Sequence, residues 1–496
     1  MKKVIARIAC GILFFLGTAL VVVTNWYCFR FDTSFSGLLF TLTTPVKGVG
    51  TGTGLTEMLG MLPWLLGAVA VYAALLALCA RYRKKCGGEE KERRWKTAER
   101  CVLCAGVLVL LLGVAHTWFR LNVTEYIRNV SSQTTLYEDH YVAPDSVAIT
   151  RPEQKPNVIC LFLESMETTY ASREDGGMQP DHNYMPNLTL LAQENVSFSD
   201  TDRLGGFLSM DKTNWTMAAL FGATSGLPFA FPVGQNSMNK YTAFAPEIIT
   251  LGDILREDGY TQEFLCGSDA TYGGRALYFS EHGDYAIYDL FTARENGDLP
   301  SADYYEWWGF EDHYLFSIAR KELTRLYESG EPFNLTLLTV DAHHLGGYLC
   351  AWCGDDYEDK TANVIACTDR QVAEFIAWCQ EQPFWENTVM IICGDHPRMD
   401  TSLTEGVPYQ KRSVYNCFLN ARAMPGEGAD TFRTASVMDL FPTTLAAMGY
   451  RIEGDRLGLG TKLFSGRKTL ADEMGYETLN TEVQKYSRYF VTHFAR

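Results

Sequence analysis

The stretch Asn387–Pro397 (NTVMIICGDHP) begins as an uncharged, largely β-branched run and ends in Gly394, Asp395 and His396. Such a run is typical of a strand buried on both faces of a parallel sheet. Ligands gather beyond the carboxyl ends of the strands in such sheets, and a carboxylate beside an imidazole is a pair of metal-ligand types. On its own, the pattern also fits a strand that leaves the core through a polar turn.

A second uncharged run has the same design. Asn157–Leu163 is followed directly by Glu164 and Ser165. If both runs are strands of one sheet, Glu164 arrives at the same edge as Asp395 and His396. Three ligands from distant parts of the chain therefore predict a metal site at this edge.

The charge of the chain is unevenly distributed. Of 496 residues with a net charge of −16, residues 1–120 carry 15 Lys and Arg against 6 Asp and Glu, so the remainder is strongly acidic. Nucleic-acid binding calls for a basic patch, and the acidic remainder argues against it. The length also exceeds that of one ordinary domain.

Three apolar runs predict membrane-spanning helices in residues 1–120. A helix needs ~20 apolar residues to cross a hydrocarbon core. The three runs are close to this length: Val4–Cys28, Met61–Ala80 and Cys101–Phe119. The first run follows Lys2 and Lys3, as a signal peptide does, but it is longer than the roughly 7–15 residues of a signal h-region. We therefore expect it to remain as an anchor.

The basic residues predict the orientation of these helices. Nine Lys and Arg lie between Arg81 and Arg100, whereas the segment 29–58 holds only Arg30 and Lys47. By the positive-inside rule, the amino terminus and the 81–100 loop are cytoplasmic. Three crossings then place everything after Arg120 outside the cell.

The rest of the sequence divides into a connector (121–155), a region of alternating strands and helices (156–470) and a polar tail (471–496). Besides the two runs above, the strand candidates are Gln262–Cys266, Phe333–Val340 and Tyr415–Leu419. The helix candidates are Pro186–Glu194, Trp215–Thr224, Glu247–Asp258, Glu311–Glu328, Thr361–Gln380 and Ser436–Met448. This alternation predicts an α/β sheet covered by helices.

A nucleophile for the metal site is suggested by Met210–Leu220 (MDKTNWTMAAL), where a helix is expected to begin. Thr213 and Thr216 both lie near that start, where the helix dipole and a metal lower the pKa of a hydroxyl. Threonine is also a common N-cap, which gives either residue a purely structural explanation.

Three motifs together resemble one bacterial enzyme family. Asn157–Thr169 (NVICLFLESMETT), Thr339–Gly347 (TVDAHHLGG) and Thr388–His396 (TVMIICGDH), in this order and spacing, resemble the phosphoglycerol transferases of lipoteichoic acid and of osmoregulated periplasmic glucans. These belong to the alkaline phosphatase/sulfatase superfamily. The resemblance implies a membrane-anchored α/β protein, with three amino-terminal transmembrane helices and a sulfatase-like α/β/α domain around a mainly parallel sheet. Shorter matching pieces are Leu251–Leu255, Trp308–Phe310 and Pro186–Leu188.

The resemblance also implies the roles of individual residues. The family's metal-binding residues correspond to Glu164, Asp395 and His396, and its threonine nucleophile, itself a metal ligand, corresponds to Thr213. An alignment offset of three moves that role to Thr216. The family's substrate-contacting histidine corresponds to His343. Its neighbour His344, which is apolar in some relatives, is a further substrate-binding candidate, and Trp308 matches, less closely, a tryptophan near the headgroup pocket.

The implied reaction transfers phosphoglycerol from phosphatidylglycerol in the outer leaflet to an envelope glycan or glycolipid, through a phosphothreonine intermediate. The family's usual cofactor is one Mn²⁺ ion, and Mg²⁺ or Zn²⁺ also suits the ligands. The implied location is the bacterial cell membrane, with the catalytic domain outside. A phosphodiesterase or other hydrolase, a phosphoethanolamine transferase and an inactive membrane scaffold are the alternatives; the intact ligand set argues against the scaffold. Sulfate-ester hydrolysis is disfavoured, because no Cys/Ser-x-Pro/Ala-x-Arg motif surrounds Thr213.

Two further features have more than one interpretation. Arg275 is a candidate for binding phosphate or a glycerol hydroxyl, although such an arginine is more often structural. Cys350 and Cys353 form a C-x-x-C pair that suggests a redox or zinc site, but no second pair accompanies it. A comparable cysteine pair in a related transferase predicts a disulfide between Cys353 and Cys367, with Cys350 as the competing partner.

Overall fold

The computed structural model describes residues 2–31, 35, 38–39, 51–84, 89–231, 238, 243–426 and 428–495. Contacts divide the chain into two units, and each is described by itself. The first comprises Met1–Leu42 and Val49–Arg128, and the second Thr43–Gly48 and Asn129–Arg496. Cys86 and Lys47 lie outside the described residues. The expected boundaries at 120, 155 and 470 stay predictions.

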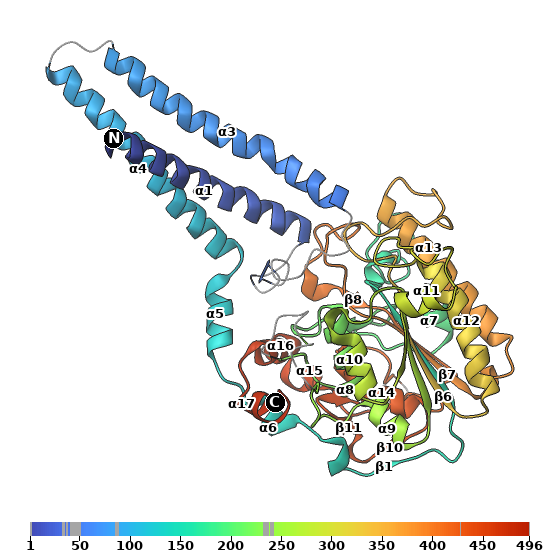
Figure 1. The fold of residues 1–496 in the computed structure, drawn as a ribbon. Coiled ribbons are helices and arrows are strands. Elements are labelled where there is room, and N and C mark those ends of the chain that lie inside the picture. Colours follow the sequence, from blue (N-terminus) through green and yellow to red (C-terminus); the bar gives the residue numbers. More distant parts are fainter. Residues whose placement is uncertain are drawn as a thin grey trace. The chain divides into compact units, whose positions relative to one another are not determined.

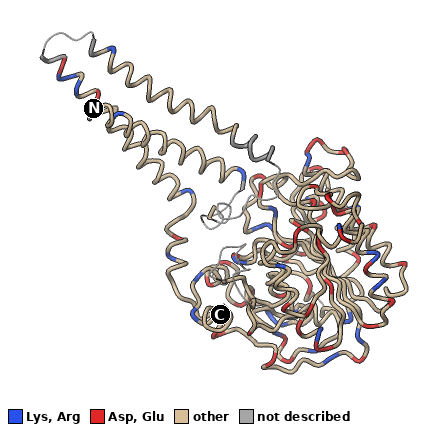
Figure 2. The backbone as a smooth tube through the Cα atoms, viewed as in Figure 1, with Lys and Arg blue, Asp and Glu red and all other residues tan. Residues whose placement is uncertain are grey.

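The first unit consists of α1 (Lys2–Phe31), α3 (Thr51–Lys84), α4 (Glu89–Arg120) and the start of α5 (Val123–Ser131). The stretches Val4–Arg30, Leu59–Tyr82 and Glu92–Arg120 are long and apolar enough to cross a membrane, which confirms the three expected apolar helices. Figure 2 shows Lys, Arg, Asp and Glu near the ends of these helices and uncharged residues along their middles.

Glycines let the backbones of α1 and α4 approach closely. A Cβ atom at Gly113 would lie 2.4 Å from the Gly17 carbonyl oxygen, and one at Gly106 would lie 2.3 Å from the Cys10 carbonyl oxygen. Small residues at helix crossings favour association in membranes, where van der Waals packing replaces the hydrophobic effect. The hydroxyls of Thr24 and Thr117 add a hydrogen bond of 2.8 Å between the two helices.

The second unit is built on a six-stranded sheet with strand order β5-β4-β6-β2-β7-β9 (Figure 1). Its strands are β2 (Asn157–Leu163), β4 (Thr261–Cys266), β5 (Ala286–Tyr288), β6 (Phe333–Leu338), β7 (Thr388–Gly394) and β9 (Asn416–Leu419). Neighbouring strands are parallel except for β9, which is antiparallel to β7. This confirms the expected mainly parallel sheet.

Both faces of the sheet are covered, as the uncharged strands predict. Val158, Cys160 and Phe162 of β2 belong to one hydrophobic cluster, and the alternate residues belong to another. The first cluster includes residues of α8 (Thr216–Ser225), α9 (Leu251–Glu257), α10 (Arg275–Glu281) and α14 (Leu440–Ala447). The second includes residues of α7 (Pro186–Glu194), α11 (Leu290–Glu295), α12 (Asp312–Glu328) and α13 (Lys360–Gln380).

Short elements complete the second unit. Among the described residues, three strand pairs lie outside the central sheet: β1 (Ile149–Thr150) with β10 (Arg451–Ile452), β3 (Phe207–Leu208) with β8 (Ser413–Val414), and β11 (Arg456–Leu457) with β12 (Gly460–Thr461). The remaining helices are α6 (Leu136–His140), α15 (Leu470–Met474), α16 (Tyr476–Gln484) and α17 (Arg488–His493). The ring centroids of Tyr137 and Phe490 lie 5.3 Å apart. The expected connector (121–155) and the expected tail (471–496) therefore pack against each other.

Helix starts differ from the sequence predictions where local capping decides them. α9 begins at Leu251 rather than Glu247, because Thr250 forms a capping box with Asp253. α8 begins at Thr216 rather than Trp215, since the backbone of Trp215 is extended. The expected helix Ser436–Met448 is a 3-10 turn (Val437–Asp439) followed by α14.

Candidate metal centre

The carboxyl ends of β2 and β7 bring the predicted ligands together. The two strands are adjacent and parallel, with Leu163 paired with Gly394. The residues that follow, Glu164 on one strand and Asp395 and His396 on the other, offer ligand atoms that all lie within 4.8 Å of one another. All three side chains are buried. The sheet register therefore produces the cluster that the two strand ends predict.

Gly394 is required by the close approach of backbone at this strand end. A Cβ atom there would lie 1.9 Å from the carbonyl oxygen of Met166, a distance no side chain can adopt. The tight packing holds Asp395 against the turn after β2, where the Ser165 N–H donates to Asp395 Oδ1 at 2.8 Å. Ser165 itself has a left-handed backbone conformation (φ 53°), which is unusual for a residue other than glycine.

His396 presents one ring nitrogen to the cluster. Its Nδ1 bonds the Pro397 carbonyl oxygen at 2.9 Å, so the neutral form of the ring carries its proton on Nδ1 and keeps a lone pair on Nε2. Nε2 lies 3.4 Å from Asp395 Oδ2 and 3.7 Å from Glu164 Oε1. A neutral imidazole fixed in this way is the usual form of a histidine metal ligand.

The carboxylates of Glu164 and Asp395 are arranged to bind a cation, because their hydrogen bonds do not occupy all of their oxygen atoms. Asp395 Oδ2 is shielded from solvent and has no hydrogen-bond partner among the described residues. Burial and the nearby Glu164 raise the pKa of Asp395 to about 7. Burial opposes the charged form of His396, but Asp395 and Glu164 outweigh it and raise the imidazole pKa. An orphaned carboxylate oxygen among crowded acids fits a bound divalent cation.

Thr216, rather than Thr213, is the threonine at this cluster. The Thr216 Oγ1 atom lies 3.3 Å from Glu164 Oε2 and 3.4 Å from His396 Nε2, at the first residue of α8. Thr213 is buried, and its hydroxyl donates to the Met210 carbonyl oxygen at 2.9 Å. The preferred assignment of Thr213 as ligand and nucleophile therefore disagrees with the geometry, because the turn at Asp211–Trp215 delays the helix start.

His343 and His344 lie beside the cluster, on the loop after β6. The centroid of the His343 ring lies 4.5 Å from that of the Trp308 ring and 4.2 Å from that of the His344 ring. Burial lowers the pKa of His343, which the nearby Glu164 partly offsets. Its Nδ1 bonds the His344 carbonyl oxygen at 2.8 Å, so Nε2 is again the free nitrogen. The buried Nε1 of Trp308 and Nδ1 of His344 have no hydrogen-bond partner among the described residues.

Arg275 is engaged by its own loop. Its guanidinium donates to the carbonyl oxygens of Tyr272 and Asp269, at 3.1 and 2.7 Å, and to Ser268 Oγ at 3.1 Å. These bonds favour the structural interpretation of this arginine, and its role in substrate binding stays a prediction.

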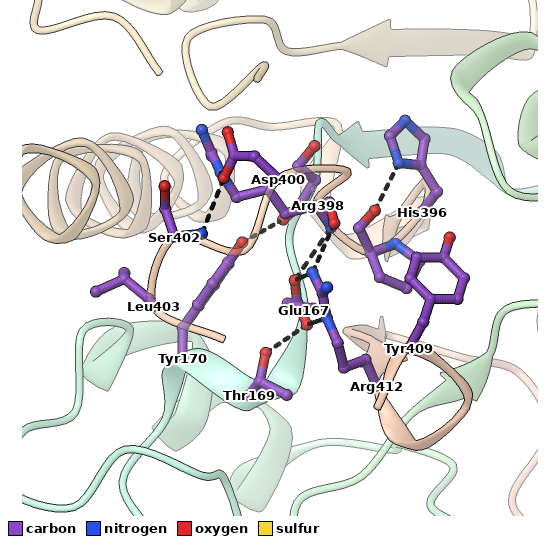
Figure 3. Close-up of polar contacts among 12 residues, drawn as sticks. Glu167, Thr169, Tyr170, His396, Arg398, Asp400, Ser402, Leu403, Tyr409 and Arg412 are labelled. Atoms are coloured by element: carbon purple, nitrogen blue, oxygen red, sulfur yellow. Dashed lines mark hydrogen bonds and ion pairs between the residues drawn. The ribbon is translucent and has the colours of Figure 1, made fainter. Parts of the chain in front are cut away.

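Two buried ion pairs, absent from the sequence predictions, fix the loops around the cluster (Figure 3). Arg398 pairs with Asp400 at 2.7 Å, and Arg412 Nε donates to Glu167 Oε2 at 2.8 Å. Arg398 Nη1 also donates to the Ala342 carbonyl oxygen, and Asp400 Oδ2 accepts from the Gly346 N–H. The Arg398–Asp400 pair thus holds both ends of the loop that carries His343. Only the adjacency of Arg398 to the Asp-His pair could have indicated this role from sequence.

The three clustered cysteines are free thiols in the structure. Cys350 Sγ lies 3.6 Å from Cys353 Sγ and 3.9 Å from Cys367 Sγ. The expected disulfide between Cys353 and Cys367 stays a prediction.

Comparison with known proteins agrees with this geometry. The family model described as Sulfatase matches residues 156–450, more than half of the sequence. The chain belongs to the sulfatase family. Members of this superfamily use a divalent metal, which matches the acidic and histidine cluster of this sulfatase-family chain.

The sulfatase-family chain is also similar to curated proteins named phosphoglycerol transferase I. It is 27% identical over 416 residues to that of Xanthomonas euvesicatoria pv. vesicatoria (80% of this chain, 55% of the relative). It is 28% identical over 442 residues to that of Escherichia coli O127:H6 (87% and 53%). The chain thus spans about half the length of these relatives.

Among solved structures, a similar fold is found in the integral membrane lipooligosaccharide phosphoethanolamine transferase A of Neisseria meningitidis. The TM-score is 0.50 at 15% identity, over 89% of this chain and 84% of that one. At this identity the match supports the fold alone.

Proposed function

We propose that this chain transfers a phosphoglycerol group from phosphatidylglycerol to an envelope glycan or glycolipid, with Thr216 as the nucleophile. The observation that carries the proposal is the Thr216 hydroxyl, which lies at the start of α8 within 3.4 Å of both Glu164 and His396. The similarity to the relatives named phosphoglycerol transferase I supports the transferred group.

Glu164, Asp395, His396 and Thr216 are the proposed ligands of one divalent metal ion. Oxygen and imidazole ligands suit Mn²⁺, our first choice, and also Mg²⁺ or Zn²⁺. When bound, such an ion lowers the pKa of a coordinated hydroxyl and stabilises negative charge on phosphate oxygens.

In the first step, Thr216 Oγ1 forms a bond to the phosphorus of phosphatidylglycerol, and the bond from phosphorus to the diacylglycerol oxygen breaks. The Thr216 proton leaves toward Glu164, to which the hydroxyl donates a hydrogen bond. The products are diacylglycerol and a phosphoglycerol ester on Thr216.

His343 is the proposed acid for the leaving oxygen. Burial lowers the pKa of its imidazole, against the opposing effect of Glu164, so the ring holds a proton less readily than an ordinary histidine. An anionic phosphodiester beside it raises the imidazole pKa, so the ring takes up a proton and delivers it to the departing diacylglycerol. Trp308 and His344, which lie against His343, contact the headgroup.

In the second step, an acceptor hydroxyl attacks the phosphorus and the bond to Thr216 Oγ1 breaks. His343, now neutral, removes the proton of the attacking hydroxyl, and Thr216 regains its own. If water takes the place of the acceptor, the same site hydrolyses the lipid headgroup. If the donor is phosphatidylethanolamine, it transfers phosphoethanolamine.

The proposed location is the cell membrane, with the α/β unit outside. Three apolar helices precede this unit, and Arg81, Arg93, Arg94, Lys96 and Arg100 lie around the connection between the second and third. Basic loops remain in the cytoplasm, so an odd number of crossings exposes the rest of the chain to the outer leaflet.

The test uses the full-length protein in vesicles of phosphatidylglycerol labelled in its headgroup, with Mn²⁺ and membranes that supply the acceptor. Thr216→Ala should reduce diacylglycerol release by about 1,000-fold or more, as loss of a nucleophile does in other covalent enzymes. Thr213→Ala, the matched control three residues away, should retain activity. Label in a glycan or glycolipid supports transfer, and label in free glycerol phosphate alone indicates a hydrolase. Full activity of Thr216→Ala rules out the proposed nucleophile.

A further inference from the structure

Three cysteines and a histidine lie together away from the proposed catalytic cluster. Cys350 and Cys353 follow the loop of His343, Cys367 belongs to α13, and His313 is the second residue of α12. The three sulfur atoms lie within 4.8 Å of one another. We propose that Cys350, Cys353, Cys367 and His313 bind a structural zinc ion.

The sulfur positions match a metal site better than a disulfide. Cys350 Sγ lies 3.6 Å from Cys353 Sγ and 3.9 Å from Cys367 Sγ. Tetrahedral zinc with Zn–S bonds of about 2.3 Å places its sulfur ligands about 3.8 Å apart, whereas a disulfide joins two sulfurs at about 2.05 Å. A disulfide also leaves one of three thiols unused, while a metal engages all of them.

His313 is suited to be the fourth ligand. It is the second residue of α12, beside the loop that carries Cys350 and Cys353. Its Nδ1 is shielded from solvent and has no hydrogen-bond partner among the described residues. The Trp352 ring stacks on the imidazole, with 5.5 Å between the ring centroids and 19° between the ring planes. A metal satisfies a buried ring nitrogen of this kind, which has no partner among the described residues and belongs to a ring stacked on the residue before Cys353.

The surroundings favour thiolates. Gln371 Nε2 and Arg370 Nη2 approach Cys367 Sγ at 3.3 and 3.6 Å, as hydrogen-bond donors. Zinc with three thiolates carries one net negative charge, which the Arg370 guanidinium balances. Cys350 and Cys367 are buried, so four protein ligands close the site, as in structural zinc centres.

The position explains what the ion does for the molecule. It joins the start of α12, the loop of Cys350 and the first half of α13. Asp312, next to His313, accepts the N–H groups of Val340 and Asp341 at 2.7 and 3.2 Å. The zinc site therefore braces the segment that leads into His343. This assignment does not depend on the proposed transferase reaction.

The first test asks about the thiols of full-length protein purified from membranes in detergent. After chelator and denaturant, but no reductant, Cys350, Cys353 and Cys367 should all react with an alkylating reagent. Two of the three reacting only after reduction reveals a disulfide and overturns the proposal.

The second test adds Co²⁺ alone to chelator-stripped, reduced protein. A thiolate site gives a strong sulfur-to-cobalt charge-transfer band, which the oxygen and nitrogen ligands at Glu164, Asp395 and His396 cannot produce. The band should saturate at one ion per chain, vanish in Cys353→Ser and persist in Cys379→Ala, a matched control on α13. No band in the wild type, or an equal band in Cys353→Ser, overturns the proposal even if other variants fail to fold.

Discussion

The two carboxylate oxygens of Asp395 have different roles in the cluster. Its Oδ1 accepts the N–H groups of Ser165 and His396, at 2.8 and 2.7 Å, and so orients both loops. Its Oδ2 is left buried without a partner among the described residues. The first oxygen therefore positions the cluster and the second is available to a cation.

Asp395→Asn tests whether the Asp395 carboxylate binds the cation. The amide keeps most of the volume but presents no negative charge to a cation, so Mn²⁺ affinity should fall by at least about 100-fold, given that residues behind the ligands alone often contribute 10- to 100-fold. Electron paramagnetic resonance of free Mn²⁺ in titrations of the full-length protein measures this. Asp298→Asn, at a partly exposed ion pair with Lys321, is the control. Unchanged Mn²⁺ affinity in Asp395→Asn contradicts the ligand assignment.

The sequence was sufficient to predict that Glu164, Asp395 and His396 lie together, because parallel strands deliver the residues that follow them to one edge. It was not sufficient to choose between Thr213 and Thr216. That choice depends on where α8 begins, and the turn before it contains Lys212 in a left-handed conformation (φ 62°) that no periodicity reveals.

At the scale of elements, buried ion pairs link the loops that follow the strand ends. Glu167 and Arg412 are both fully buried, and Glu167 also accepts the Arg398 N–H at 3.1 Å. Arg398 in turn contacts the carbonyl oxygen of Ala342. The loops after β2, β6 and β7 are therefore joined through charged groups that have no access to water.

Arg412→Met removes one partner of this network and leaves Glu167 buried without its counterion. Such a change typically costs about 3–5 kcal/mol, because the remaining charge loses its compensation. Thermal unfolding in detergent should show a clear loss of stability, and headgroup transfer should fall with it. Arg422→Met, at an exposed arginine bonded to Asn387, should have little effect on either. Equal unfolding temperatures for the two variants would show that the pair does not hold the loops.

The order of strands and helices could be predicted from hydrophobic periodicity, but this network could not. Arg398, Asp400 and Arg412 lie in segments without regular structure, and the groups that they tie down, at Ala342, Gly346 and Glu167, are distant in sequence. The same limit applied to the cysteines: the C-x-x-C pair was visible, whereas Cys367 comes from α13, whose packing brings it to the pair.

At the scale of the whole molecule, the buried acid Glu263 makes stability depend on pH. Burial and then the neighbouring Glu322 raise the pKa of Glu263 to about 7, against the opposing effect of Arg325. A carboxyl group whose pKa is raised on folding binds its proton more tightly in the folded state. Its contribution to stability is therefore present below the unfolded pKa and is lost as pH rises toward 7.

Glu263→Gln should remove this pH dependence. Relative to the wild type, the variant should gain stability between about pH 4.5 and 7, by at most about 3 kcal/mol according to the conversion of pKa shifts to free energy. Unfolding temperatures of both proteins across that range measure the change, with Glu331→Gln at an exposed position as control. A difference between Glu263→Gln and wild type that does not vary with pH contradicts the prediction.

The reaction proposed for the whole chain depends on a covalent ester at Thr216. Full-length protein exposed briefly to phosphatidylglycerol and quenched in acid can be digested and its peptides analysed by mass spectrometry. We expect the mass of one phosphoglycerol group on the peptide that contains both threonines, with fragmentation locating it on Thr216, and no adduct in Thr216→Ala. An adduct on Thr213, or continued turnover with Thr216 never modified, would contradict the proposal.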